Sequence, residues 1–258
     1  MIFDAHFHLP VCLERGLPLY DDKNYSALSC AHSFEEWAAQ WNYVQNQNNF
    51  VKDKFFLSYG MHPQSAGAFS DEDVKKTADF LESILKSEKI SAIGEAGFDY
   101  FTLEYKEAAE MQEKMFQIQL ELAIAYNKPL VIHCRKANHK LFEYSRELSR
   151  CRAVLFHSFM GPATEALSLC RHNINAFFSF GKQIFNNNKK AIECVKTLPL
   201  ENLLLETDAP FQTLKGEINT LPQEINDVYH EASRLRNAQS FENFCSTIAK
   251  STRELLGK

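Results

Sequence analysis

The sequence predicts an α/β fold, a single TIM-like (β/α)8 barrel that spans residues 1–258 and carries its active site at the C-terminal ends of the strands. Three observations lead to this prediction. Eight short apolar segments alternate mostly with segments of helical periodicity, and no linker or low-complexity tract separates them. Buried strands that alternate with helices form a parallel sheet, and eight such units close into a barrel. Histidines or acidic residues follow five of the eight segments.

An open, doubly wound sheet is the main alternative arrangement. That fold carries a glycine-rich, phosphate-binding turn after its first strand. In this sequence His6 stands at that place, and no glycine-rich fingerprint follows it. The barrel is therefore the preferred prediction.

The first predicted strand, residues 2–9, reads Ile-Phe-Asp-Ala-His-Phe-His-Leu. A strand sends alternate side chains to the same side, so His6 and His8 point together, with Asp4 one step behind them. In a closed parallel barrel that side is the interior and its mouth. Two imidazoles that converge there begin a metal site, although His-x-His alone also fits two hydrogen-bonded histidines in an apolar strand.

The other strands are short apolar runs bounded by turn residues. They are predicted at residues 25–30, 55–59, 90–94, 130–132, 153–156, 176–180 and 203–206. Helices are predicted from the N-cap Ser33 to about residue 44, and over residues 71–86, 104–126, 141–148, 224–236 and 241–256. The segment 10–23, which contains Pro10, Gly16 and Pro18, is expected to form a loop over the barrel mouth.

The composition is that of an ordinary globular protein, with 45% apolar and 24% charged residues. A net charge of −5 argues against a broad basic surface, so a phosphate substrate has to be held locally by Arg, Lys, His or metal ions. The seven cysteines form no Cys-x-x-Cys pair, which favours reduced thiols. Because we see no signal peptide and no apolar run long enough to cross a membrane, we expect a soluble, cytoplasmic protein.

Residues of the kinds that bind metal ions recur at the ends of five predicted strands, where barrels place their active sites. They are His6, His8, Glu95, His133, His157 and Asp208. Each one alone has an ordinary explanation, as a hydrogen-bonded core histidine, a turn residue or a helix cap. Without cations, however, the set would leave several unpaired or shifted groups in one pocket, at a cost of several kcal/mol.

Four histidines and two carboxylates exceed what one hydrolytic metal ion uses. We therefore expect two divalent cations that share a carboxylate. Imidazole ligands favour Zn or Mn, and the carboxylates are also compatible with Mg. Such two-metal sites favour the hydrolysis of phosphate esters and amides.

Six motifs carry a resemblance to a known family, and they run along most of the chain. They are Asp-Ala-His-Phe-His at 4–8, Gly-Met-His-Pro at 60–63, Ile-Gly-Glu-Ala-Gly-Phe-Asp-Tyr at 93–100, Pro-Leu-Val-Ile-His-Cys-Arg at 129–135, His-Ser-Phe-Met-Gly at 157–161 and Leu-Glu-Thr-Asp-Ala-Pro at 205–210. With these motifs the sequence resembles the TatD-type metal-dependent deoxyribonucleases of the amidohydrolase superfamily.

The resemblance implies a TIM-like barrel with two cations bridged by Glu95. One cation would be held by His6, His8 and Asp208, and the other by His133 and His157. The implied activity is the hydrolysis of phosphodiester bonds in DNA, from an end. The expected partner is therefore DNA as substrate, single-stranded or at its ends, and no obligate protein partner is evident.

Some positions depart from the family pattern. Members usually have Asp where Pro10 stands and often a second His where Gln64 stands, and Lys136 replaces a common acidic residue. After Pro210, residues 211–218 replace the usual proline-containing basic loop. These departures concern the substrate side, and every expected metal ligand is intact.

Two catalytic and two substrate-binding roles follow as hypotheses. Asp208 is suited to accept the proton of an attacking water, beside Glu95 as the second catalytic carboxylate. Arg135 shares strand parity with His133 and can present its guanidinium group to phosphate oxygens, although a surface salt bridge is the alternative. His62, at a neighbouring strand end, could donate to the same phosphate.

Supporting residues are expected one pleat deeper. Asp4 and Glu206 share the inward parity of the ligands, and metal-bound histidines usually give their second N–H to such groups. A salt bridge elsewhere in the barrel is the alternative for both. The remaining histidines fall in predicted helices or loops and are expected at the surface; they are His32, His139, His172 and His230.

Two other functions remain open at this stage. The same metal ligands would serve an amidohydrolase that acts on a cyclic amide, a lactone or a phosphotriester. A catalytically inactive metal-binding scaffold is the second alternative, because the loop after Pro210 has diverged from the family pattern.

Overall fold

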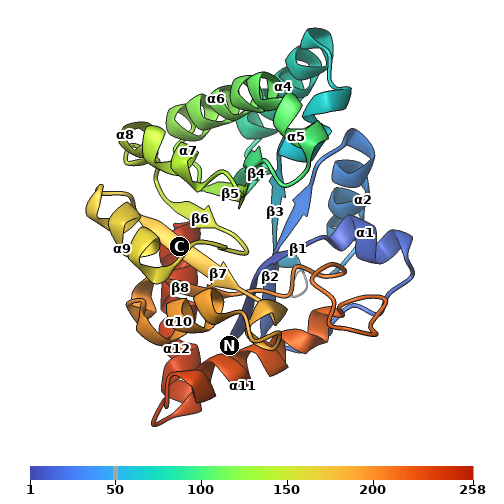
Figure 1. The fold of residues 1–258 in the computed structure, drawn as a ribbon. Helices are drawn as coiled ribbons and strands as arrows, with labels where there is room; N and C mark the ends of the chain where they lie inside the picture. Colours follow the sequence, from blue (N-terminus) through green and yellow to red (C-terminus); the bar gives the residue numbers. More distant parts are fainter. Residues whose placement is uncertain (49–51, 258) are drawn as a thin grey trace.

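The computed structural model describes residues 1–48 and 52–257, and it confirms the predicted barrel (Figure 1). Eight parallel strands lie in one sheet in the order β1 to β8, so that each strand pairs with the next one along the chain. The strands are β1 (Ile2–Phe7), β2 (Tyr25–Ala31), β3 (Phe55–Tyr59), β4 (Ala92–Asp99), β5 (Leu130–Arg135), β6 (Val154–Phe156), β7 (Ala176–Phe180) and β8 (Leu203–Leu205).

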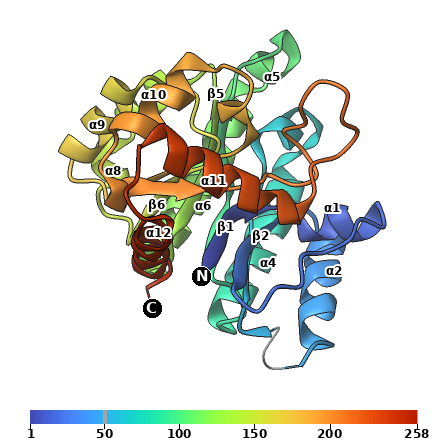
Figure 2. The same ribbon diagram turned by 90° about the horizontal axis from the view of Figure 1, so that it is seen from below.

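Helices surround the strands on the outside of the barrel (Figure 1). The α-helices are α1 (Leu9–Glu14), α2 (Phe34–Gln45), α4 (Asp71–Lys86), α5 (Leu103–Glu107), α6 (Ala109–Ala125), α7 (Asn138–Glu143), α8 (Ser145–Leu148), α9 (Ala163–Arg171), α10 (Lys189–Thr197), α11 (Ile225–Leu235) and α12 (Phe241–Leu256). Short 3-10 turns lie at η1 (Pro63–Ala68), η2 (Lys182–Ile184), η3 (Leu200–Asn202) and η4 (Pro222–Glu224). Figure 2 shows both termini at one end of the barrel, with α5 and the loop before α11 at the opposite end.

Serine caps begin several of these helices. The Ser33 hydroxyl accepts a hydrogen bond from the Glu36 amide at 3.1 Å, as predicted for the start of α2. Ser70 and Asp73 form a reciprocal capping box at the start of α4. Each cap satisfies an amide that the helix itself leaves unpaired, and such caps typically contribute about 1 kcal/mol.

Some predicted boundaries were wrong. The segment 10–23 is not all loop, because residues 9–14 form α1; Pro10 lies in its first turn, where a missing amide hydrogen is harmless. The helix predicted over residues 104–126 is divided at Ala108 into α5 and α6. Strand β4 continues to Asp99, because its second half still pairs with β5. Helices α9 and α10 cover stretches where we predicted none.

Two buried glutamines of α6 hold the ends of β3 and β4. The Gln119 side chain accepts from the Met61 amide at 2.8 Å and donates to the Met61 carbonyl at 3.2 Å. Gln112, two turns earlier on the same helix face, accepts from the Asp99 amide at 2.8 Å and donates to the Asp99 carbonyl at 3.0 Å. Because buried backbone groups are costly when unpaired, these amides fix the chain where it leaves the sheet.

Hydrogen bonds from side chains and from the backbone hold β1 in place and close the seam between β1 and β8. The Tyr229 hydroxyl of α11 accepts from the Phe3 amide at 3.1 Å and donates to the Phe3 carbonyl at 3.0 Å. Asp4 accepts from the amide of Thr207 at 2.8 Å and from its hydroxyl at 2.6 Å. Beyond β8, the Asp208 amide donates to the His6 carbonyl at 2.9 Å. The seam therefore joins the chain around His6 directly to the chain around Asp208.

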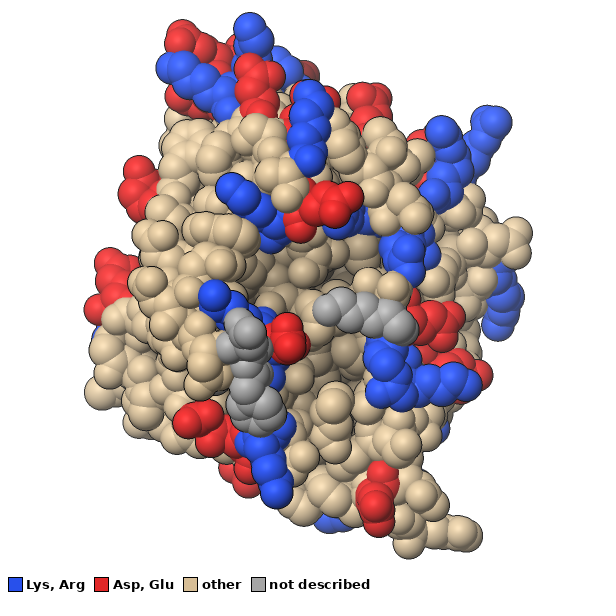
Figure 3. Space-filling view, turned by 180° about the vertical axis from the view of Figure 1, so that it is seen from behind, with Lys and Arg blue, Asp and Glu red and all other residues tan. Residues whose placement is uncertain are grey.

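The end of the barrel away from α5 carries charge of both signs. Figure 3, which views the molecule from behind Figure 1, shows Lys and Arg side chains interspersed with Asp and Glu over this face. Within residues 1–48 and 52–257, we find no helix that combines the length and the apolar character of a membrane span.

The two hydrogen bonds between the Tyr229 hydroxyl and the Phe3 backbone, here called the Tyr229 bridge, yield a stability prediction. Tyr229→Phe leaves the Phe3 amide and carbonyl without their buried partner, so we expect the free energy of unfolding to fall by about 1–3 kcal/mol. Urea denaturation followed by circular dichroism measures this difference. Tyr43→Phe on α2, a half-buried tyrosine whose ring packs on Phe55, is the matched control and should stay within about 0.5 kcal/mol of the unsubstituted protein. Equal losses in both variants would contradict the bridge.

Candidate metal centre

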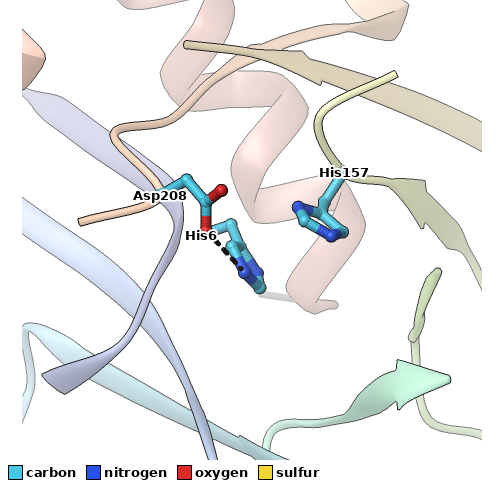
Figure 4. Close-up of side chains that lie close together, drawn as sticks. All are labelled: His6, His157 and Asp208. Carbon is cyan, nitrogen blue, oxygen red and sulfur yellow. Dashed lines mark ion pairs between the residues drawn. The ribbon is translucent and has the colours of Figure 1, made fainter. Parts of the chain in front are cut away.

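The ligand-type residues predicted from the sequence converge at one end of the barrel. His6 lies in β1 and His133 in β5, while His8, His157 and Asp208 follow β1, β6 and β8. Glu95 lies inside β4 rather than at its end. Figure 4 shows His6, His157 and Asp208 pointing toward one another from separate segments of the barrel. The barrel therefore brings these side chains together although they are far apart in the chain; His6 and Asp208, for example, are 202 positions apart.

The first group of donor atoms surrounds Oε1 of Glu95. His6 Nε2 lies 3.3 Å and His8 Nε2 3.7 Å from this oxygen. Oδ1 of Asp208 lies 3.5 Å from His6 Nε2 and 3.2 Å from His8 Nε2, and the two imidazole nitrogens are 3.2 Å apart. Two ligands of one tetrahedral zinc ion are about 3.4 Å apart, given bonds of about 2.0–2.1 Å. The spacing of these atoms therefore fits a single cation.

The second group surrounds Oε2 of the same carboxylate. His157 Nε2 lies 2.5 Å and His133 Nδ1 3.6 Å from Oε2, and the two nitrogens are 3.3 Å apart. The His62 ring also approaches, with Nε2 3.7 Å from Oε2. Among the described residues, three sets bring one nitrogen or carboxylate oxygen from each member within 4.8 Å of the others, namely His6, His157 and Asp208; His6, His8 and Glu95; and His62, Glu95 and His133. The two oxygens of Glu95 thus face two different sets of imidazoles.

The burial and ionisation of the Glu95 carboxylate, and the kinds of donor atoms around it, suit cation binding. The Glu95 side chain is only 2% exposed, and among the described residues its Oε1 has no hydrogen-bond donor. Burial alone would raise the pKa of Glu95, but the neighbouring His157 and His6 lower it well below its ordinary value, so the carboxylate is ionised. Imidazoles and carboxylates without a thiolate are a donor set for Zn or Mn. The residues present therefore fit divalent cations.

An aspartate that the sequence analysis missed supports His133. Asp99 Oδ2 lies 3.1 Å from His133 Nε2 and accepts from the Gln64 side chain at 2.8 Å, while Oδ1 accepts from the Phe101 amide at 2.8 Å. Burial raises the pKa of Asp99, but these hydrogen bonds outweigh it and lower the pKa overall. Asp99 shares strand parity with Glu95, and that signal could have identified it.

The predicted supporting acids lie beneath the ligands. Glu206 is fully buried; its Oε1 lies 3.9 Å from His157 Nδ1, and its Oε2 accepts from the Ser179 hydroxyl at 2.5 Å. Asp4 is bonded to Thr207 and, at 3.4 Å, to the His6 amide, so it contacts the ligand strand through the backbone. The other ring nitrogen of His6 lies 3.2 Å from the Cys30 sulfur.

The surface prediction for His32 was wrong. This residue directly follows β2 and lines the central cavity, where its Nε2 lies 2.9 Å from Glu95 Oε1. The surface prediction rested on the position of His32 in a loop or helix after the strand predicted at residues 25–30, but in the barrel the end of β2 opens into the same cavity as the end of β1. The other three histidines are exposed, as predicted; they are His139, His172 and His230.

The two predicted phosphate-binding residues also line the cavity. His62 Nδ1 accepts from the Gln64 amide at 3.2 Å, which leaves Nε2 facing the centre. The Arg135 guanidinium group stacks over Phe101, 3.5 Å from the ring centroid. The cavity measures about 550 Å³, within the range of about 300–1,000 Å³ typical of ligand sites. Phe211 and Gln212, from the divergent loop after Pro210, form part of its wall.

Fold and site together define a class of protein, the metal-dependent hydrolases that place imidazole and carboxylate ligands at the C-terminal ends of barrel strands. The sequence profile of the family described as "TatD related DNase" matches residues 3–257. The chain therefore belongs to the TatD family and is a metal-dependent hydrolase.

Several known proteins are similar to this chain. The uncharacterized metal-dependent hydrolase MG009 of Mycoplasma genitalium is 36% identical over 84% of this chain and 85% of its own length. The crystal structure of YJJV, a TatD homolog from Escherichia coli, superposes with a TM-score of 0.81 over 100% of this chain and 98% of that chain, at 23% identity. At this low sequence identity, the similarity to the YJJV structure shows a shared fold.

Two relatives carry nuclease names. The human "3'-5' RNA nuclease TATDN2" is 32% identical over 62% of this chain and 21% of its own length. The "Deoxyribonuclease Tat-D" of Schizosaccharomyces pombe is 33% identical over 61% of this chain and 52% of its own length.

The contact between Asp99 and His133 yields a prediction about cation affinity. Asp99→Ala removes the group that orients the His133 ring, and loss of such an outer partner typically weakens metal binding about 10- to 100-fold. Isothermal titration of metal-stripped protein with Zn²⁺ measures the change. Asp79→Ala, on the exposed face of α4, is the control and should leave the affinity unchanged. Unaltered affinity in Asp99→Ala would show that His133 is oriented by other contacts.

Proposed function

We propose that the protein is a phosphodiesterase dependent on two divalent cations, and that it acts on nucleic acid, with DNA at single-stranded regions or ends as its substrate. The observation that carries this proposal is the position of the Glu95 carboxylate, whose two oxygens face two separate groups of donors. In the proposed arrangement His6, His8 and Asp208 would hold one cation, His133 and His157 would hold the other, and the Glu95 carboxylate would serve both. When bound, such cations lower the pKa of a water molecule and neutralise charge on a phosphate.

In this proposal Asp208 accepts the proton of the attacking water. Its Oδ1 lies beside His8, and its Oδ2 accepts from the Gln212 side chain at 3.2 Å. Burial raises the pKa of Asp208, but the hydrogen bond from His8 and the neighbouring His6 lower it overall. The carboxylate is therefore ionised at neutral pH, as a general base requires.

Two residues on the cavity wall are suited to hold the phosphate. Because His62 Nδ1 accepts a backbone hydrogen bond, the neutral ring carries its hydrogen on Nε2, which can donate to a phosphate oxygen. Arg135 offers a forked donor on the same wall, held flat by Phe101. These local donors supply the recognition that a net charge of −5 cannot supply over the whole surface.

The nuclease names of two relatives support nucleic acid as the substrate class. One of those names specifies RNA and the other DNA. The proposed roles of Asp208 and Glu95 are the same for DNA and for RNA. Selection of the sugar would therefore come from other residues of the cavity wall, including the divergent loop at residues 211–218. A comparison of matched DNA and RNA oligonucleotides decides it.

Substitution of the proposed base is the first test. Asp208→Asn retains a neutral oxygen ligand but cannot accept the proton, so we expect turnover to fall about 10²- to 10⁴-fold while cations still bind in part. Turnover is followed with an end-labelled oligonucleotide, and bound metal is followed by elemental analysis. Full turnover in Asp208→Asn would remove its assigned role.

A substrate panel tests the reaction class. We expect cation-dependent hydrolysis of bis(p-nitrophenyl) phosphate and of single-stranded DNA, and no hydrolysis of a dihydropyrimidine or a lactone. A chelator should abolish the activity, and Mn²⁺ or Zn²⁺ should restore it. Hydrolysis of the cyclic amide or the lactone alone would contradict the proposal in favour of an amidohydrolase. Failure on every substrate despite bound cations would indicate a scaffold.

A further inference from the structure

His32 has a place in the site that neither its sequence context nor the ligand sets described above explain. Its Nε2 is buried and lies 2.9 Å from Glu95 Oε1. Among the residues that the structure describes, neither of these two atoms has a hydrogen-bond partner. The two atoms approach each other without forming a hydrogen bond, and a cation between the imidazole and the carboxylate would satisfy both of them.

The opposite side of the His32 ring faces a carboxylate. Nδ1 lies 3.9 Å from Glu36 Oε2, and the same oxygen accepts from the His32 amide at 2.6 Å. His157 has the same environment, with Nε2 toward Glu95 and Nδ1 3.9 Å from Glu206. Histidines that bind metal ions typically show this pattern, with one nitrogen toward the ion and the other toward a carboxylate.

His133 repeats the pattern, with one nitrogen toward Glu95 and the other 3.1 Å from Asp99. The ring spacing agrees as well. The His8 and His32 rings are 5.3 Å apart, between the 4.8 Å of His6 and His8 and the 5.4 Å of His133 and His157. His32 is thus spaced from a ligand of the first group as the ligands are spaced from one another.

His62 is the instructive contrast. It also approaches Glu95, but its Nδ1 accepts the Gln64 amide hydrogen, so Nε2 of the neutral ring carries a hydrogen and has no lone pair for a cation. In His32, Nδ1 faces the Glu36 carboxylate at 3.9 Å and no backbone amide of the described residues donates to it, so a hydrogen on Nδ1 would leave the lone pair of Nε2 free for a cation. The two histidines therefore differ in what they can offer.

We propose that His32 is a further protein ligand of the cation on the Oε1 side of Glu95, together with His6, His8 and Asp208. The proposal rests on the two-cation arrangement proposed above. It makes the two sites unequal, because the first has five protein ligands, whereas the second has only Glu95, His133 and His157. A site filled by protein binds its cation more tightly, and a site with an open position is the one that admits water or substrate.

The test compares the metal-stripped proteins in titrations with Co²⁺ and Zn²⁺. For the unsubstituted protein we expect two binding steps, the first tighter than the second. In His32→Ala we expect the tighter step to weaken by about 10- to 100-fold or more, and the visible absorption of the Co²⁺ protein to change, because a nitrogen ligand is lost. Glu36→Gln should weaken the same step by a smaller factor, and His139→Ala, an exposed histidine, should change nothing.

Other results would overturn either the ligand role of His32 or the two-cation arrangement, and the two cases are distinguishable. Unchanged cobalt absorption and unchanged affinities in His32→Ala would overturn the ligand role, and a raised KM for the oligonucleotide in that variant would then assign His32 to substrate binding. Binding of only one cation, or of none, by the unsubstituted protein would overturn the two-cation arrangement instead. Circular dichroism of every variant excludes loss of folding, and Glu36→Gln, which leaves all proposed ligands in place, gives an independent reading.

Discussion

The buried carboxylate of Glu95 is the group on which the whole site depends. An ionised carboxylate that is 2% exposed is costly unless positive charge surrounds it, and here imidazoles approach both of its oxygens. Among the described residues, Oε1 of Glu95 and Nε2 of His32 are also buried without a hydrogen-bond partner. A divalent cation would resolve both problems, since it would pair with the carboxylate and accept the lone pair of a ring. The chemistry of a metal-dependent hydrolase thus follows from a single electrostatic constraint inside the barrel.

The barrel holds these groups through contacts that lie just outside the site. Asp4 and Thr207 close the seam between the first and last strands, and Tyr229 completes it from α11. Gln112 and Gln119 fix the ends of β4 and β3 in the same manner. Rigid attachment matters because ligand spacing within a few tenths of an ångström decides whether a cation fits. Stability and function therefore share the same buried polar contacts.

The sequence predicted the fold and most of the candidate site, and the failures have physical causes. His6 and His8 were found by strand parity, which is a local property of the chain. His32 was missed because it was assigned to the loop or helix after the second strand, whereas the end of β2 opens into the same cavity as the end of β1. Asp99 was missed because β4 was predicted to end near Gly94, whereas pairing with β5 extends it. In both cases a contact between distant segments decided the outcome.

Local patterns in the sequence establish eight short strands that alternate mostly with helices, with acids and imidazoles after particular strands, because periodicity and turn residues act over a few neighbouring positions. The closed barrel sets which oxygen of Glu95 faces which imidazoles, that Asp4 is hydrogen-bonded to a residue 203 positions away, and that His32 enters the site. These features arise when the sheet curves until its first strand meets its last. That closure sets the distances between side chains that are far apart in the chain.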